Sequence, residues 1–316
     1  MQSEDHTSSP APNRALAALF ERGPVALLTG AGISTDSGIP DYRGTGGIYR
    51  RDEATAAGGP GAAADRGADS GARGPRAARR SPRTPMRIEK FIHDEAYRRR
   101  FWAGARVGAL RMASVEPNAG HRAVVALEHS GYLSGVITQN VDGLHGRAGT
   151  SNLAELHGNG AVVRCIPHDH RFTRAEVLAW FDVANPGFAE RNADAEITPD
   201  GDADVRETAG VRVPVCPACG GMLRPDVVYF GEHVPAPVFQ HAERIVQGAS
   251  ALVIAGSSLA VNTGLRLVHR AEQRGMPIGV INRGPTQVDH RDSVVVRIEG
   301  GTTETLVALA ELVGVG

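Results

Sequence analysis

Short apolar segments alternate with helical patterns along most of this 316-residue chain. The apolar segments read VALLTG (25–30), SGVITQ (134–139), SALVIAG (250–256), MPIGVIN (276–282) and SVVVRI (293–298). Amphipathic patterns of helical period accompany them, as in residues 118–131 and 262–275. Strands that are apolar on both faces are typical of a parallel sheet covered by helices on both sides. The sequence therefore predicts an α/β fold with a doubly wound, Rossmann-like parallel sheet.

Two segments depart from this alternation. Residues 54–83 are rich in Ala, Gly, Pro and Arg, so they bury too little apolar surface to offset their chain entropy, and we expect a disordered insertion. Residues 161–224 have weak periodicity, many acidic residues and cysteines near both ends, which indicates a separate, smaller lobe. The predicted division is a Rossmann-like domain (13–43, 113–160 and 225–316), a lid or helical module containing the insertion (44–112), and the small lobe (161–224).

Charge and hydropathy argue against several classes of partner. The net charge of −1 provides no general attraction to nucleic acid or to membrane surfaces. Acidic side chains between residues 182 and 207 would also repel a phosphate backbone. The chain has no apolar run long enough to cross a membrane, and its polar N-terminal segment has no signal-peptide core. We therefore expect a cytoplasmic protein with no direct nucleic-acid or membrane partner.

The cysteines indicate a metal site. The chain has three of them, so they cannot all form disulfides with one another. Cys216 and Cys219 form a C-x-x-C pair. In a reducing compartment such a pair favours a metal over a disulfide.

Glycines follow the first predicted strand directly. Gly30 and Gly32 would let backbone N–H groups approach a phosphate without an intervening side chain. An ordinary strand-to-helix turn is the alternative interpretation. Thr35 stands where a dinucleotide-binding fingerprint has its third glycine, which argues against a redox dehydrogenase.

Polar residues also follow the second predicted strand. They are Gln139, Asn140, Asp142 and His145, and His157 comes shortly before the small lobe. Each has a structural explanation, because Asn140 or Asp142 could cap a helix and a single histidine could be a packed core residue. The carboxyl ends of parallel strands lie at one edge of a sheet, where ligands bind. We therefore expect these side chains to face the same crevice as the glycine loop.

Seven segments of the chain together resemble the sirtuins, which are NAD-dependent protein deacylases. In order they are GAGISTDSGIPDYRG, TQNVDGLH, ELHG, CPACGG, RPDVVYFGE, GSSLAV and VIN, spread from residue 30 to residue 282. The stretches TPMRIEKF and YRRRFWAGARVG are similar to the class II branch of that family. The insertion at 54–83 departs from the family pattern.

The resemblance implies that NAD binds between the Rossmann-like domain and a zinc lobe. The diphosphate would lie against residues 30–34, namely Gly30, Ala31, Gly32, Ile33 and Ser34. A mobile lid would include Asp41, Tyr42 and Arg43. The adenine side would be contacted by Gly256, Ser257, Ser258, Asn282, Arg283 and Gly284, with Thr302 or the neighbouring Gly301 closing the pocket.

The resemblance also implies the chemistry. The oxygen of an acyl-lysine substrate attacks the ribose as nicotinamide leaves, and His157 acts as general base on a ribose hydroxyl. An imidazole suits this role because its ordinary pKa, about 6.5, lies near the working pH. Asn140 and Asp142 would orient the nicotinamide half, and Gln139 would contact the ribose. Residues 226–232 resemble the strand that pairs with a substrate peptide, although an internal strand explains them equally well.

The implied zinc site departs from the two C-x-x-C pairs of the family. The first pair here reads Cys165-Ile166-Pro167-His168. We therefore predict a structural zinc ion held by Cys165, His168, Cys216 and Cys219, with His170 as the substitute for His168.

Several functional alternatives remain open at the level of sequence. An ADP-ribosyltransferase would use the same cleavage of NAD, and a non-catalytic NAD-sensing protein would use the same fold. The partners implied are acylated lysine side chains of proteins or peptides. Residues 49–52 have no Tyr-x-x-Arg pair, the mark of the succinyl-preferring branch, so we expect acetyl or longer neutral acyl groups.

Overall fold

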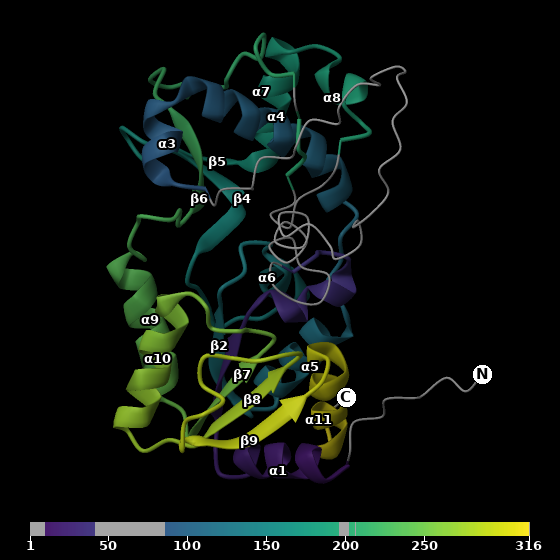
Figure 1. The fold of residues 1–316 in the computed structure, drawn as a ribbon, viewed down its shortest axis with the longest axis vertical. Helices are drawn as coiled ribbons and strands as arrows, with labels where there is room; N and C mark the ends of the chain where they lie inside the picture. Colours follow the sequence, from purple (N-terminus) through teal and green to yellow (C-terminus); the bar gives the residue numbers. More distant parts are fainter. Residues whose placement is uncertain (1–9, 42–85, 196–201, 206, 316) are drawn as a thin grey trace, which may run out of the picture.

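The computed structural model describes residues 10–41, 86–195, 202–205 and 207–315. These residues form two lobes, one around a parallel sheet and one around a smaller antiparallel sheet (Figure 1). The predicted insertion at 54–83, the predicted lid residues Tyr42 and Arg43, and residues 49–52 lie outside the described residues. Within the described part of the chain, no helix combines the length and the apolar content needed to cross a membrane.

The larger lobe contains a six-stranded sheet in the order β3-β2-β1-β7-β8-β9, with every neighbouring pair parallel. The strands are β1 (Val25–Thr29), β2 (Leu133–Thr138), β3 (Leu153–Glu155), β7 (Ala251–Ala255), β8 (Ile278–Asn282) and β9 (Val294–Glu299). Chain order reverses between β1 and β7, which is the position where doubly wound sheets bind ligands. The predicted fold class is confirmed, and β3 is a short strand that the sequence analysis did not identify.

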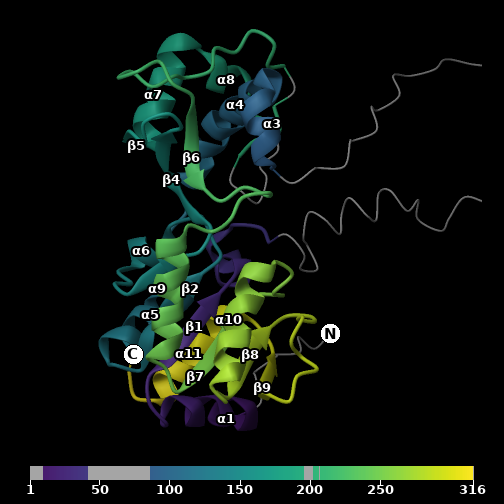
Figure 2. The ribbon, with the colours of Figure 1, turned by 90° about the vertical axis from the view of Figure 1, so that its left-hand side faces the viewer.

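Helices cover both faces of this sheet (Figure 2). One face packs against α1 (Pro10–Phe20), α5 (Ala119–His129) and α11 (Thr302–Leu312). The other packs against α9 (Ala236–Gln247) and α10 (Asn262–Gln273). Every residue of β1, β7 and β8 is buried, so alternate side chains enter the two cores, and this explains why these strands are apolar throughout.

The smaller lobe contains a three-stranded antiparallel sheet in the order β5-β4-β6. Its strands are β4 (Gly158–Cys165), β5 (Arg171–Thr173) and β6 (Leu223–Val227), and its helices are α3 (Ile88–His93), α4 (Glu95–Met112), α7 (Arg174–Ala184) and α8 (Phe188–Arg191). Phe91 and Trp102, from α3 and α4, share a core with Phe181 and Leu223. The helices of the predicted helical module thus pack with the predicted small lobe, and the three-part division stays a prediction.

Candidate active site

The loops after β1 and β7 meet at the point where chain order reverses. A Cβ atom on Gly32 would lie 2.6 Å from the Cα of Gly256, and one on Gly30 would lie 2.7 Å from the carbonyl oxygen of Gly256. Gly256 has a φ of +66°, and its own Cβ would lie 2.7 Å from the Oγ1 of Thr302. These positions require glycine because the two backbones touch, and Thr302 lies beside them.

Backbone hydrogen bonds fix the first loop, which forms the short helices η1 (Ala31–Ile33) and η2 (Thr35–Ser37). Several of its N–H groups donate to backbone carbonyls of the protein, among them those of Gly30, Gly32, Ile33 and Ser34. The glycines therefore provide close approach between two loops. Contact between these residues and a diphosphate stays a prediction.

Asn140 and Asp142 point at the first loop from the end of β2. The Nδ2 of Asn140 donates to the carbonyl of Gly30 and to the Oγ of Ser34, each at 3.1 Å. The Oγ of Ser34 donates to the Oδ2 of Asp142 at 2.7 Å. The other carboxylate oxygen accepts the N–H of Leu144 at 2.9 Å, at the start of α6 (Leu144–Ala148). The structure therefore brings together Ser34, Asn140 and Asp142, as expected for one crevice.

Gln139 connects this group to β7 and to the predicted base. Its Oε1 accepts the hydroxyl of Ser257 at 2.6 Å. Its backbone carbonyl lies 2.9 Å from the Nδ1 of His157. The predicted residues at the ends of β1, β2 and β7 and after β3 thus form one connected set at the carboxyl edge of the sheet.

The contact with Gln139 fixes the tautomer of His157. A carbonyl oxygen can only accept a hydrogen bond, so Nδ1 carries the proton and Nε2 of the neutral ring has a free lone pair. Burial lowers the pKa of His157 below its ordinary value, although the bond to Gln139 opposes this shift. The ring is therefore neutral near pH 7, the form that a general base requires.

A pair of histidines, His121 and His145, lies buried beneath the crevice. His145 was expected to face the crevice, but it is 2% exposed, and its Nε2 lies 2.9 Å from the Oγ1 of Thr29. The ring of His121 packs against it with 4.9 Å between centroids. Burial lowers the pKa of His121 to about 4 and that of His145 to about 3. Both rings are thus neutral and part of the core, and no motif in the sequence points to His121.

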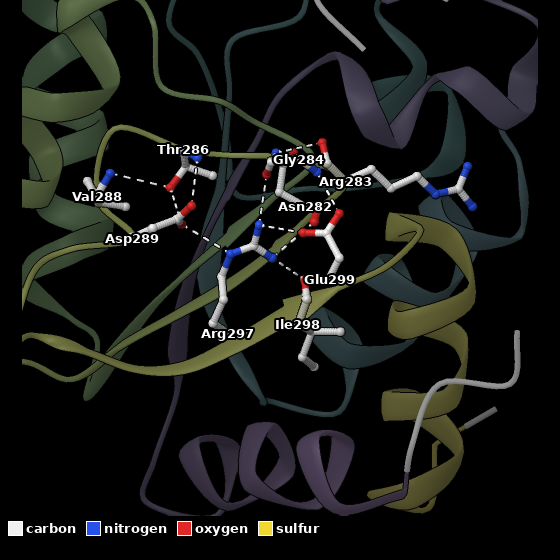
Figure 3. Close-up of polar contacts among 9 residues, drawn as sticks. All are labelled: Asn282, Arg283, Gly284, Thr286, Val288, Asp289, Arg297, Ile298 and Glu299. Atoms are coloured by element: carbon white, nitrogen blue, oxygen red, sulfur yellow. Dashed lines mark hydrogen bonds and ion pairs between the residues drawn. The ribbon is translucent and has the colours of Figure 1, made fainter. Parts of the chain in front are cut away.

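The predicted adenine-side residues lie at the ends of β7 and β8. Asn282 ends β8, and its Nδ2 donates to the carbonyls of Arg283 and Gly284 at 3.1 and 2.9 Å (Figure 3). Ser258 accepts the N–H of Gln287 at 3.1 Å, which joins the loop after β8 to the loop after β7. Asp41, the described member of the predicted lid, is half-buried.

Four metal-binding side chains converge in the small lobe, and they correct the predicted set at one position. The donor atoms of Cys165, His170, Cys216 and Cys219 all lie within 4.8 Å of one another. In the hairpin between β4 and β5, the N–H of Cys165 donates to the carbonyl of His170 at 2.9 Å. This register puts His170 beside Cys165, whereas the predicted ligand His168 is exposed at the hairpin tip.

The distances and donor chemistry fit a structural zinc ion. The sulfurs of Cys165 and Cys219 are 3.4 Å apart, and the Nδ1 of His170 is 3.3 Å from the sulfur of Cys216. Tetrahedral zinc would require donor separations of roughly 3.5 to 3.8 Å. Burial raises the pKa of the Cys216 thiol, but hydrogen bonds from His170 and backbone amides outweigh burial and lower it to about 6. The thiolate of Cys216, the form that binds metals, is therefore accessible at neutral pH, whereas burial raises the pKa of the Cys165 thiol to about 11.

Comparison with known proteins identifies the family. The model of the Sir2 family matches residues 78–263, more than half of the chain. The chain belongs to the Sir2 family. This sirtuin is 42% identical over 290 residues to NAD-dependent protein deacetylase 1 of Mycobacterium avium, covering 91% of the present chain and 90% of that relative. It is 40% identical over 288 residues to NAD-dependent protein deacetylase 1 of Streptomyces coelicolor, covering 90% and 85% of the two chains.

Solved sirtuin structures share the arrangement of both lobes. A structure of Sir2 with a p53 peptide and NAD+ matches with a TM-score of 0.66 at 25% identity, covering 95% of this chain and 98% of that one. A structure of Sir2Tm bound to a propionylated peptide matches with a TM-score of 0.65 at 25% identity, covering 96% and 99%. These matches cover 95% and 96% of the chain, so they take in residues of both lobes.

Proposed function

We propose that this chain is an NAD-dependent protein-lysine deacylase that releases nicotinamide and O-acyl-ADP-ribose. The observation that carries the proposal is the hydrogen bond between His157 and the carbonyl of Gln139, which leaves Nε2 of His157 free as a base at the sheet edge. The relatives in the Sir2 family that bear the name deacetylase support the same activity.

Bound NAD would supply an electrophilic ribose carbon for the reaction. His157 would take a proton from a ribose hydroxyl at Nε2, while Nδ1 keeps its own proton and donates it in the hydrogen bond to the carbonyl of Gln139. Asn140 and Asp142 would orient the nicotinamide end, since Ser34 already holds both side chains in place. Close contact of Gly32 with Gly256 would leave the crevice floor without side chains, so the cofactor could lie near the backbone.

The peptide substrate would pair with the segment that contains β6. Asp226 and Val227 pair with Asn159 and Gly158 of β4 on one side, and β6 is an edge strand of the small sheet. The guanidinium of Arg224 donates to the carbonyls of Pro225 and Val227. An acylated peptide in extended form would add along the other side by replacing these contacts with backbone hydrogen bonds. Solved relatives with p53 and propionylated peptides support a peptide partner of this kind.

Cys165, His170, Cys216 and Cys219 would hold one zinc ion. Four protein ligands fill a tetrahedral coordination sphere, so the ion would stabilise the small lobe and take no part in the reaction. We also propose a cytoplasmic location, because three cysteine ligands require thiols that stay reduced.

Product analysis tests the proposal. The full chain is incubated with NAD labelled in its adenine and with an acetyl-lysine peptide or the matched unacetylated peptide. We expect free nicotinamide and labelled O-acetyl-ADP-ribose with the acetylated peptide alone. Label attached to protein or peptide would instead favour ADP-ribosyl transfer, and absence of nicotinamide release in every arm would favour a non-catalytic NAD-binding protein.

A further inference from the structure

The guanidinium of Arg297 binds the loop that follows β8 (Figure 3). Arg297 lies on β9, the neighbouring strand. Its Nη1 donates to the carbonyl of Asn282 at 3.0 Å, and its Nη2 donates to the carbonyl of Gly284 at 2.8 Å. These two bonds span the segment 282–284, which the resemblance assigns to the adenine side of the cofactor.

Two carboxylates accept hydrogen bonds from the guanidinium, and each of them also accepts a hydrogen bond from the loop. Glu299 accepts Nη2 of Arg297 at 2.9 Å with one oxygen, and with the other it accepts the N–H of Gly284 at 2.7 Å. Asp289 accepts Nε of Arg297 at 3.1 Å. Both backbone groups of Gly284, which has a φ of +83°, are therefore bound to side chains of β9.

The same carboxylate connects Arg297 to the loop after β7. Asp289 also accepts the N–H and the hydroxyl of Thr286, at 2.8 and 2.5 Å. This turn presents the N–H of Gln287 to the carbonyl of Ser258 at 3.1 Å. One arginine thus lies at the centre of contacts that fix both loops assigned to the adenine side.

The geometry requires a guanidinium. Its planar fork reaches three backbone carbonyls, those of Asn282, Gly284 and Ile298, and two carboxylates at once. An ammonium group is a single point of charge with three donors. The side chain of Arg297 is 25% exposed, so a simple ion pair here would contribute little to stability. The number of backbone carbonyls that it binds indicates a role in shaping the loop.

We propose that Arg297 is a positioning residue for NAD: it holds residues 282–284 in the conformation that receives the adenosine half of the cofactor. This proposal rests on the proposed function. If the loop adopts the binding-competent conformation for only a fraction of the time, the apparent affinity of the protein for the cofactor falls to that fraction of its intrinsic value. Loss of Arg297 should therefore weaken cofactor binding and leave the peptide site and the chemical step unchanged.

The test compares Arg297→Lys with a matched control, Arg270→Lys. Arg270 is an exposed arginine of α10 that pairs with Glu243 at 2.7 Å, away from the crevice loops. ADP-ribose is titrated calorimetrically, and KM is measured separately for NAD and for an acetyl-lysine peptide. We expect Arg297→Lys to raise the Kd for ADP-ribose and the KM for NAD about tenfold. The KM for peptide and kcat should stay within about twofold, and Arg270→Lys should match the wild type.

A second variant tests the proposal in case Arg297→Lys is too unstable to fold. Glu299→Gln keeps Arg297 but removes the negative charge that binds both the guanidinium and the N–H of Gly284. We therefore expect the Kd for ADP-ribose and the KM for NAD to rise less than they do in Arg297→Lys. If Arg297→Lys fails to fold by circular dichroism, Glu299→Gln decides the question. Unchanged ADP-ribose binding in a folded variant overturns the proposal, as does a rise in the KM for peptide equal to the rise in the KM for NAD.

Wild-type behaviour separates this proposal from the proposed function. ADP-ribose binding by a wild-type chain that releases no nicotinamide would contradict the deacylase function and still allow the role of Arg297 to be measured. If the wild-type chain does not bind ADP-ribose, both proposals are wrong.

Discussion

The two lobes are stabilised in different ways. The large sheet has an apolar core on each face, and its central strands are buried along their whole length. The small lobe has a single core of helices and short strands, together with four metal-binding side chains that join one hairpin to the Cys216–Cys219 turn. The proposed reactive groups thus lie at the edge of the sheet that has two apolar cores. The small lobe, which borders the proposed peptide site, depends in addition on its metal-binding side chains.

The largest expected effect on activity comes from removing the proposed general base of the larger lobe. His157→Ala should lower deacylation by roughly 100- to 10,000-fold, because a positioned general base contributes that much. Folding should be unaffected, since the imidazole is half-buried at the edge of the sheet. The measurement is nicotinamide release at saturating NAD and peptide. The control is His129→Ala, an exposed residue at the end of α5, and near-normal turnover of His157→Ala would remove the proposed role.

The next effect concerns the metal site and compares two neighbouring histidines. His170→Ala removes a ligand, so zinc affinity should fall by more than the roughly 10- to 100-fold that loss of an outer contact costs. His168→Ala should keep one zinc per chain, because His168 is exposed at the hairpin tip. The zinc content of each variant is measured after dialysis, and circular dichroism follows the unfolding of the small lobe in both variants. Equal zinc content in the two variants would contradict the ligand set.

A third prediction tests how tightly the sheet loops meet. Gly256→Ala combines a left-handed φ of +66° with a Cβ 2.7 Å from the Cα of Gly32. Gly275→Ala is matched, with a φ of +65° and no atom within 4 Å of the added Cβ. We expect a cost of about 1 to 2 kcal/mol for Gly275→Ala and about 1 to 3 kcal/mol more for Gly256→Ala. Urea unfolding measures both, and equal losses would show that the loops can separate freely.

The smallest effect is a pH dependence that belongs to the sheet lobe. Burial lowers the folded-state pKa of His121 to about 4, below the ordinary value of about 6.5. The unfolded chain therefore binds more protons between these values, and stability falls as pH decreases through that window. Between pH 7 and pH 5, protonation of His121 alone should lower the free energy of unfolding by about 2 kcal/mol.

Variants isolate this contribution from the effect of acid on the metal site. His121→Asn should show a smaller loss of stability between the two pH values than the wild type, whereas His129→Asn should match the wild type. The quantity compared is the free energy of unfolding in urea at constant zinc concentration. An unchanged pH dependence in His121→Asn would contradict the assignment.

The sequence predicted what depends on local pattern. Continuous apolar segments identified the five longer strands of the sheet. Gly30 and Gly32 were expected to admit a phosphate, which stays a prediction, whereas their close contact with Gly256 was not foreseen. The strand β3 was missed because three residues carry too little periodicity. His168 was chosen in place of His170 because spacing along the chain does not reveal the register of a hairpin. Arg297 belongs to no motif, since its role arises from packing of β9 beside β8.

His157 occupies the short connection between the two sheets, after β3 and immediately before β4. The preceding residue, Leu156, donates its N–H to Thr138 in the large sheet, and the carbonyl of His157 accepts the N–H of Val228, just beyond β6. The backbone that carries the imidazole is therefore anchored to the large sheet on one side and to the small lobe on the other, so the position of the proposed base depends on how the two lobes meet.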